Sequence, residues 1–215
     1  MSELVPIPSP GIPLTFGDRG RPLVLLLHDW YGRLPWLASY ATALSSQEYR
    51  VIVPDLYNGA ATVEAATAEV LMAQLDVAGA LAELDAIIQV ARAEGSTRVG
   101  VVGFSLGGWL ALLHAQSGEA DAVVAYYATL RPAQHGVIPA PVLLHLAEID
   151  EWDEGEDPES FIDRLKDHGT PITEWTYLAT VHSFANATIT DRVDVNAAAL
   201  AFARTSSFLE DHLLD

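Results

Sequence analysis

The chain contains no cysteine among its 215 residues, which excludes disulfide bonds, thiolate metal sites and a cysteine nucleophile. Positive charge is also scarce, because 11 Lys and Arg stand against 29 Asp and Glu and the formal net charge is −18. A surface of this sign repels phosphate backbones and anionic lipid headgroups. We therefore expect neither a nucleic-acid partner nor a membrane partner, and we attribute the charge to solubility.

Long hydrophobic runs are missing as well. No run approaches the roughly 18 apolar residues that a membrane span needs, and the N-terminus lacks the basic start and apolar stretch of a signal peptide. These absences predict a cytoplasmic protein. Half of the residues are hydrophobic and 19% are charged, which is the composition of a folded chain with a complete core. We expect one domain over residues 1–215.

Strand-like and helix-like segments alternate along the chain. Short apolar runs predict buried strands at 23–28, 50–54, 98–102, 121–127, 141–147 and 171–178. Helical patterns occur at 37–46, 63–93, 106–116, 159–166 and 191–214. In the longest of them, Gly79 with Asp76 as a cap indicates a break into two helices. The alternation is typical of βαβ units, so we predict an α/β fold, a mostly parallel central sheet with helices on both faces.

The segment Gly103-Phe104-Ser105-Leu106-Gly107 carries the most chemical information. It joins a predicted buried strand to a predicted helix, and glycines stand two residues before and two residues after its serine. That pattern is typical of the nucleophile elbow of α/β-hydrolases, a turn too tight for side chains at either glycine. The alternative is a glycine-rich turn in which the serine only caps the helix. The strand before it and the helix after it favour Ser105 as a nucleophile that attacks a carbonyl.

A nucleophilic serine needs a base that accepts its proton and an acid that orients the base. In this fold the acid and then the base follow the serine, each just after a later strand. Asp150 follows the run at 141–147 and His182 follows the run at 171–178, so these are the predicted acid and base. The competing acids are Glu148, Glu151 and Asp153. Five other histidines are expected in packing, loop or surface positions: His114, His135, His145, His168 and His212.

The negative charge that develops on the substrate oxygen needs backbone N–H donors. One is predicted at Leu106, directly after the serine, where the N-terminal end of the helix adds a favourable field. The second is predicted at Trp30, in the loop 28–32 after the first core strand. Aromatic residues near these positions and near the acid are either pocket walls or ordinary core. They are Trp30, Tyr31, Trp36, Tyr127 and Trp152.

Five segments together resemble the dienelactone hydrolase family of α/β-hydrolases. They are Leu27-His28-Asp29-Trp30-Tyr31-Gly32, Val53-Pro54-Asp55-Leu56-Tyr57, Gly103-Phe104-Ser105-Leu106-Gly107-Gly108, Ala147-Glu148-Ile149-Asp150, and the stretch from Tyr177 to Asn186. The resemblance covers most of the chain, from about residue 14 to the C-terminus. It implies a compact α/β-hydrolase fold without a large lid domain, and it implies ester hydrolysis.

The chain departs from the dienelactone-cleaving members at three positions. Ser105 stands where those members have Cys, and Asp29 stands where they have a Glu that contacts the thiol. Asn186, four residues after the predicted base, replaces an Arg that binds the substrate carboxylate. The resemblance therefore implies a substrate other than dienelactone, with Arg33 or Arg131 as a candidate substitute charge. Asp29 is either a turn residue that holds the following loop or an accessory group of the site.

The sequence thus predicts a serine hydrolase that cleaves a small carboxylic ester or lactone, without a metal or other cofactor, as a monomer or a small homo-oligomer. Ser105 attacks the carbonyl while His182, oriented by Asp150, accepts its proton. Two alternatives remain open at this point. One is an acyltransferase of the same fold that uses an acceptor other than water, and the other is a ligand-binding protein of this fold without turnover.

Overall fold

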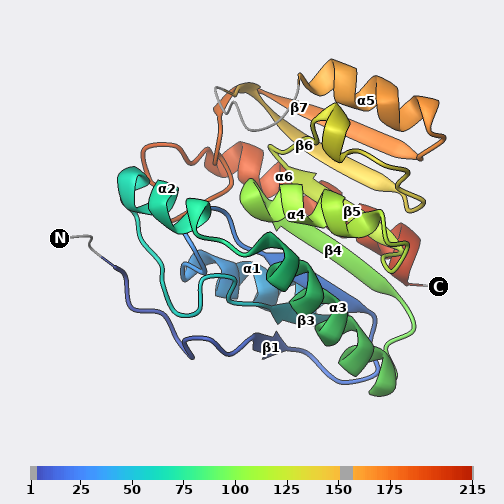
Figure 1. Cartoon of the computed structure of the whole chain (residues 1–215), viewed down its shortest axis with the longest axis horizontal. Helices are drawn as coiled ribbons and strands as arrows, with labels where there is room; N and C mark the ends of the chain where they lie inside the picture. The colour runs from blue at the N-terminus through green and yellow to red at the C-terminus, as the bar shows by residue number, and fades with distance from the viewer. Residues whose placement is uncertain (1–3, 151–156, 215) are drawn as a thin grey trace.

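In the computed structural model, which describes residues 4–150 and 157–214, seven strands form one sheet. Their order across the sheet is β1-β3-β2-β4-β5-β6-β7 (Figure 1). Neighbouring strands are parallel except β1 and β3, which are antiparallel. The strands are β1 (Leu14–Phe16), β2 (Leu23–Leu27), β3 (Arg50–Val53), β4 (Val99–Phe104), β5 (Ala122–Tyr126), β6 (Val142–Ile149) and β7 (Ile172–Val181).

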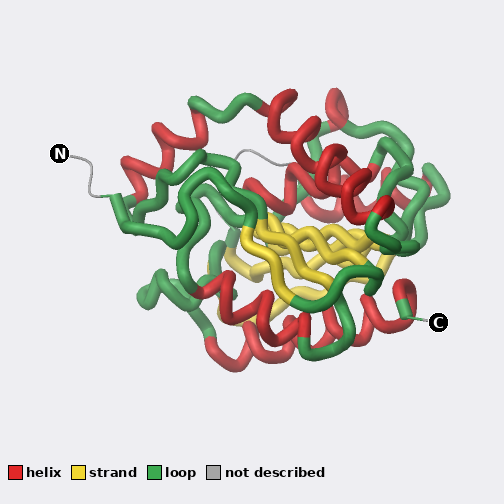
Figure 2. The backbone as a smooth tube through the Cα atoms, turned by 90° about the horizontal axis from the view of Figure 1, so that it is seen from below, coloured by secondary structure: helices red, strands yellow, loops and turns green. Residues whose placement is uncertain are grey.

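Helices cover both faces of this sheet, and Figure 2 shows the strands between two helical layers. One layer contains α1 (Trp36–Ser45) and α6 (Val195–Leu213). The other contains α3 (Val77–Ala93), α4 (Leu106–Ala115) and α5 (Pro158–Asp167). The short α2 (Ala65–Ala73) lies near the N-terminal end of α4, and a 3-10 turn, Pro132–Gln134, follows β5 (Figure 1).

Alternate residues of the central strands enter two separate cores. Leu26 and Val102 pack in the core under α1 and α6, whereas Leu25 and Val101 pack in the core under α3, α4 and α5. This is the period-2 alternation of side chains in a strand. Because both faces are covered, every residue of β2, β4 and β5 is buried. The predicted mostly parallel sheet with helices on both faces is confirmed.

Several element boundaries differ by two to four residues from the sequence-based expectation, as at the start of α6, which is Val195 rather than residue 191. β7 ends at Val181 rather than near residue 178, because Val181 still pairs with Ile149 after a register shift in β6. The long helical stretch breaks at 74–76, so the predicted division into two helices with Asp76 as the cap is confirmed. The side chain of Asp76 caps α3 by accepting a hydrogen bond from the Gly79 N–H at 3.0 Å, so the glycine belongs to the first turn.

A chain of buried polar side chains ties α6 to the sheet. The hydroxyl of Thr205 lies 2.8 Å from the hydroxyl of Tyr126 on β5 and 2.9 Å from Nε2 of His145 on β6. Nδ1 of His145 lies 2.9 Å from the hydroxyl of Tyr177 on β7. Burial lowers the pKa of His145 to about 3, so its ring stays neutral. His145 points into the neighbouring helical layer, as expected from the sequence.

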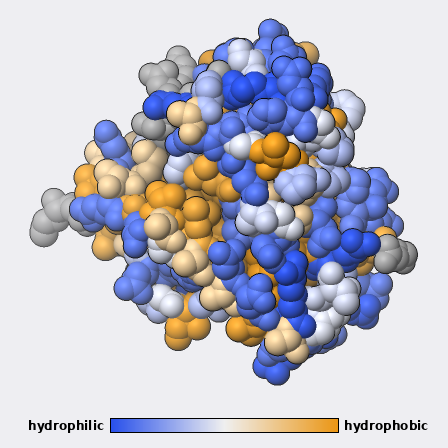
Figure 3. All heavy atoms as spheres, turned by 45° about the vertical axis from the view of Figure 1, so that its right-hand side comes forward, coloured by the Kyte–Doolittle hydropathy of each residue, from blue (hydrophilic) through white to orange (hydrophobic). Residues whose placement is uncertain are grey.

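Hydrophilic residues dominate the face drawn in Figure 3, and hydrophobic residues gather mainly on one side of it. Large apolar side chains are exposed at separate places, for example Val70 on α2 and Leu178 on β7. Among the described residues, no helix combines the length and the apolar character that a membrane crossing requires. Single exposed apolar residues of this kind are ordinary on protein surfaces.

Replacing Thr205 with Val should lower the free energy of unfolding by about 1–3 kcal/mol, because the Tyr126 hydroxyl and the His145 ring each lose a buried partner. Denaturant unfolding measures the change. The matched control is Ser206→Ala in the next position, since the Ser206 hydroxyl is buried and has no hydrogen-bond partner within the described structure. The control should keep or raise the stability, and equal losses in both variants would contradict the role of Thr205.

Candidate active site

Ser105 lies on the turn between β4 and α4 with φ 52° and ψ −114°, a conformation that residues other than glycine rarely adopt. A Cβ on Gly103 would collide with the carbonyl of Gly107, and a Cβ on Gly107 would lie 2.5 Å from the carbonyl oxygen of His28. The N–H of Ser105 donates to the carbonyl of Tyr126 on β5 at 2.9 Å. The tight turn holds the serine at the carboxyl edge of the sheet, as the elbow pattern predicts.

His182 and Asp150 meet Ser105 in one hydrogen-bonded chain. Oγ of Ser105 lies 2.7 Å from Nε2 of His182. Nδ1 of His182 lies 2.8 Å and 3.0 Å from the two carboxylate oxygens of Asp150. A proton on Nδ1 satisfies the carboxylate and leaves Nε2 as the acceptor for the serine hydroxyl. The ends of β4, β6 and β7 thus bring together the predicted nucleophile, the predicted acid and the predicted base.

Residues that competed for these positions are engaged elsewhere. Oε2 of Glu148 accepts a hydrogen bond from the Ala179 N–H at 2.6 Å. Outside the described residues lie Glu151 and Asp153. Nε2 of His114 on α4 lies 2.9 Å from the carboxylate of Asp85 on α3, so this histidine pairs two helices. The remaining candidates pack against neighbouring rings, His135 against Phe161 and His168, and His212 against Phe208.

The loop after β2 passes directly beside the elbow. Nδ1 of His28 donates to the carbonyl of Asp29 at 2.7 Å, and Nε2 accepts the Leu56 N–H at 3.2 Å. These two bonds need a neutral ring, and burial lowers the pKa of His28 to about 4. Leu106 is the first residue of α4, and N–H groups of a first helical turn have no acceptor inside the helix. Leu106 and Trp30 therefore lie on the two segments that flank Ser105.

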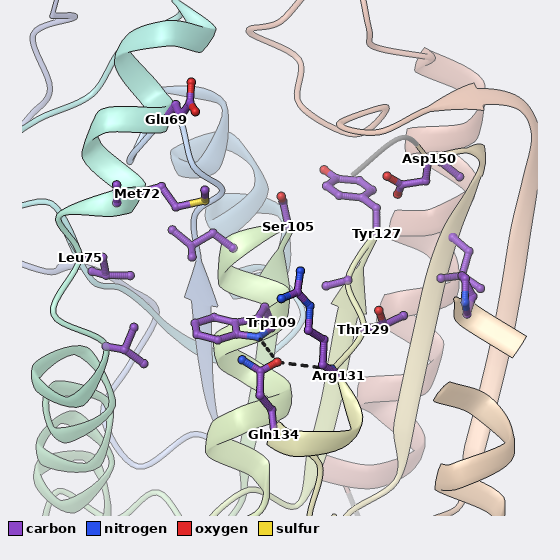
Figure 4. A pocket seen from close by; sticks show the side chains of 17 residues that line it. Glu69, Met72, Leu75, Ser105, Trp109, Tyr127, Thr129, Arg131, Gln134 and Asp150 are labelled. Carbon is purple, nitrogen blue, oxygen red and sulfur yellow. Dashed lines mark hydrogen bonds between the residues drawn. The ribbon is translucent and has the colours of Figure 1, made fainter. Parts of the chain in front are cut away.

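A cavity of about 460 Å³ opens at Ser105 (Figure 4). Met72 and Leu75, from α2 and the segment after it, form one wall of the cavity. Trp109, one helical turn after Ser105 on α4, lies below the serine in this view. Leu106 and Val77 also line this side. The wall that faces Ser105 from α2, α3 and α4 is therefore largely apolar.

The opposite wall is more polar. Tyr127 and Asp150 lie on the far side of Ser105 from Met72, and Arg131 extends toward the serine from the segment after β5 (Figure 4). The side-chain oxygen of Gln134 accepts hydrogen bonds from the Trp109 indole and from the Arg131 backbone N–H, both at 3.3 Å. Tyr127 adopts a positive φ of 40°, and its ring centroid lies 4.8 Å from that of His182. Arg131 and Tyr127 are thus the predicted residues that reach this cavity.

Several predicted pocket residues lie behind the site instead. The rings of Tyr31 and Trp36 are buried in the core under α1, and Trp36 packs edge-on against Phe104 at 4.7 Å between centroids. Trp30 is half-buried and packs between both cores. Arg33 cannot supply a charge to the cavity, because its guanidinium donates to the carbonyls of Pro8, Ser9 and Ile12. Trp152 lies outside the described residues.

Asp29 and Asn186 also lie away from the cavity, and they contact each other. Both are completely buried, and the amide of Asn186 donates to Oδ2 of Asp29 at 2.7 Å. Burial raises the pKa of Asp29 to about 6. Neither side chain is placed to bind a substrate group.

Some lining residues were not anticipated. Glu69, Met72, Leu75 and Val77 lie around the break between α2 and α3, where tertiary packing decides the direction of the side chains. Trp109 could have been found, because it stands one helical turn after Ser105, and its N–H donates to the Ser105 carbonyl at 2.8 Å. Of the described residues, no group of three or more His, Cys, Asp or Glu side chains is arranged to hold a metal ion.

The sequence model of the dienelactone hydrolase family matches residues 15–213. Two relatives named carboxymethylenebutenolidase, from Pseudomonas putida and Pseudomonas knackmussii, are each 28% identical over 202 residues. Each alignment covers 87% of this chain and 85% of the relative. The similarity therefore extends over nearly the whole length of both proteins.

Solved structures share the fold at lower identity. A dienelactone hydrolase-like promiscuous phosphotriesterase from metagenomic libraries aligns with a TM-score of 0.77 at 17% identity, covering 91% of this chain and 88% of that one. A fungal esterase from Rhizomucor miehei aligns with a TM-score of 0.68 at 15% identity, covering 91% and 76%. The α/β-hydrolase fold predicted from the sequence is confirmed, and no large lid domain is present among the described residues.

The His28 ring should remain neutral down to about pH 4, because burial disfavours its charged form. Its folded pKa lies below the ordinary value of about 6.5, so the unfolded chain binds more protons between these two values. His28 should therefore favour unfolding as the pH falls from about 6.5 to 4, by about 1.4 kcal/mol per pH unit at most. An NMR titration of the ring protons measures the midpoint. A midpoint near 6.5 would show that the ring does not make its two neutral hydrogen bonds.

Proposed function

The chain belongs to the dienelactone hydrolase family, and we propose that it is a serine esterase that cleaves a small carboxylic ester or lactone. Membership of the family makes it a carboxylic ester hydrolase. The observation that carries the finer proposal is the hydrogen-bonded chain from Ser105 through His182 to Asp150 at the cavity. This order of nucleophile, base and acid is the one that acyl transfer to serine requires.

In the acylation step, Oγ of Ser105 attacks the ester carbonyl and Nε2 of His182 accepts the hydroxyl proton. The 2.7 Å separation of these two atoms allows the transfer without rearrangement. The Asp150 carboxylate accepts a hydrogen bond from the Nδ1–H of His182 throughout and stabilises the imidazolium that forms. His182 then donates its proton to the leaving alkoxide, which departs as the alcohol and leaves an acyl-Ser105.

Two backbone N–H groups stabilise the oxyanion in this proposal, those of Leu106 and Trp30. Leu106 contributes the first N–H of α4, whose positive helix end favours negative charge. Trp30 lies on the loop whose carbonyl groups at positions 27 and 28 touch the elbow at Gly107. In deacylation, water gives a proton to His182 and its oxygen attacks the acyl carbonyl. His182 then gives that proton to Oγ of Ser105, which releases the carboxylic acid and restores the serine.

The cavity favours a neutral apolar substituent on the substrate. The wall formed by Met72, Leu75 and Trp109 offers apolar surface and aromatic contact close to Ser105. The side chain at position 186, which in dienelactone-cleaving members of the family is the arginine for the substrate carboxylate, is here an asparagine bonded to Asp29. We therefore place a short acyl or aryl group of the substrate against this apolar wall. We do not expect position 186 to bind a substrate carboxylate.

Ser105→Ala should lower kcat for p-nitrophenyl acetate by a factor on the order of 10⁴ or more, since no other group at the site forms the acyl-enzyme. The substitution removes only the hydroxyl group that contacts His182, and for this reason we expect substrate binding to change little. Initial rates at saturating ester measure kcat, with circular dichroism to establish that the variant is folded. Undiminished turnover in the folded variant would sink Ser105 as the nucleophile.

Met72→Trp should fill part of the cavity beside the apolar wall and lower kcat/KM for an octanoyl ester about 10-fold or more relative to an acetyl ester. The acyl-chain series with p-nitrophenol as the common leaving group measures this ratio. Val70→Trp is the matched control, because Val70 lies on the same helix, α2, and is 54% exposed. An equal loss of kcat/KM on both esters, or the same change of the ratio in the control, would show that Met72 does not contact the acyl group.

A further inference from the structure

Asp29 and Asn186 form a buried bridge between two segments that are 157 residues apart in the chain. Asp29 lies on the loop after β2, directly before Trp30. Asn186 lies four residues after His182, on the turn that follows β7. The hydrogen bond of 2.7 Å therefore joins the segment of the proposed oxyanion donor to the segment of the proposed base.

Every oxygen of the pair has a defined donor. Oδ1 of Asp29 accepts the N–H of Tyr31 at 2.9 Å, and Oδ2 accepts the amide of Asn186. The side-chain oxygen of Asn186 accepts the N–H of Thr188 at 2.9 Å, and the backbone N–H of Asn186 donates to the Ser183 carbonyl at 2.9 Å. Because each side chain also binds its own loop, the bridge transmits the position of one loop to the other.

The pair has no direct route to the substrate. Both side chains are completely buried, and neither lines the cavity at Ser105. Burial alone disfavours the Asp29 carboxylate and raises its pKa to about 6, and the Asn186 hydrogen bond only partly offsets this effect. Apolar residues of similar shape would avoid that cost, so net stabilisation is a weak reason for a buried carboxylate here. The effect of the buried pair that remains is that it holds the two loops in a fixed geometry.

We propose that Asp29 and Asn186 are positioning residues whose side-chain hydrogen bond sets the distance between the Trp30 N–H and the His182 ring. This inference rests on the proposed function. Acyl transfer needs the oxyanion donor and the base in register, because the attacked carbonyl lies between them and an error near 1 Å costs about 100-fold in rate.

The test exchanges the two side chains. In Asp29→Asn, the single side-chain oxygen at position 29 cannot accept from both the Tyr31 N–H and the Asn186 amide, so the hydrogen bonds of the bridge cannot all form. In Asn186→Asp, two buried carboxyl groups face each other in place of a carboxylate and an amide, and they either repel or share one proton. In the double variant Asp29→Asn/Asn186→Asp, the amide at position 29 donates to the carboxylate at position 186. The double variant also keeps acceptors for the N–H groups of Tyr31 and Thr188.

Each single variant should lower kcat for p-nitrophenyl acetate about 10- to 100-fold with KM changed by less than about threefold, because alignment affects the transition state more than substrate binding. The double variant should return kcat to within about threefold of the wild type. A double variant no better than the singles would overturn the inference. So would wild-type kcat in Asn186→Leu, since that variant keeps the Asp29 carboxylate and removes its side-chain donor.

A stability control separates positioning from general damage. Thr170→Val removes a buried hydrogen bond of 2.7 Å to the Ile138 carbonyl, at the start of β7 and away from the site. It should lower the melting temperature while kcat stays within about twofold of the wild type. If a single variant does not fold, the double variant decides, because restored folding with low kcat would still overturn the inference. Ser105→Ala tests the proposed function separately, and its outcome does not depend on the bridge.

Discussion

The close approach of backbone at the Ser105 turn is the constraint on which the rest of the site depends. Gly107 lies so near the carbonyls at positions 27 and 28 that a Cβ there would reach 2.5 Å from an oxygen. The first turn of α4 can therefore pack directly on the end of β2. This contact brings the Trp30 loop beside the nucleophile, and the N–H bond from Ser105 to the Tyr126 carbonyl fixes the same turn to β5. Side chains at either glycine would separate these three segments.

Sheet and elbow were predictable because they depend on local pattern. Continuous apolar runs such as Leu23–Leu27 are buried on both faces, and the glycine spacing around Ser105 allows few other structures. The end of β7 was less predictable. Val181 belongs to the strand because it pairs with Ile149 beyond a register shift, and that tertiary contact is not visible in the local sequence. The cap at Asp76, by contrast, was predictable from its residue type.

The relation between Asp29 and Asn186 could not be derived from spacing, because a contact across 157 residues depends on the finished fold. The same limit explains why the sequence left Tyr31 and Trp36 open between pocket and core, since the direction of a side chain on a turn or at a helix start follows from packing. By contrast, Asp150 and His182 follow strands, and the carboxyl ends of parallel strands meet at one edge. The order of strands and residues was therefore enough to bring those two together.

The central claim is that Ser105 forms a covalent acyl-enzyme with a small ester. The most direct measurement is intact-protein and peptide mass spectrometry after reaction with a p-nitrophenyl alkylphosphonate, which mimics the tetrahedral intermediate and stays bound to the nucleophile. If Ser105 is the nucleophile, one stoichiometric adduct forms on the peptide that contains Ser105, and p-nitrophenol is released at the same rate. An adduct on a different residue, or no adduct in the folded protein, would contradict it.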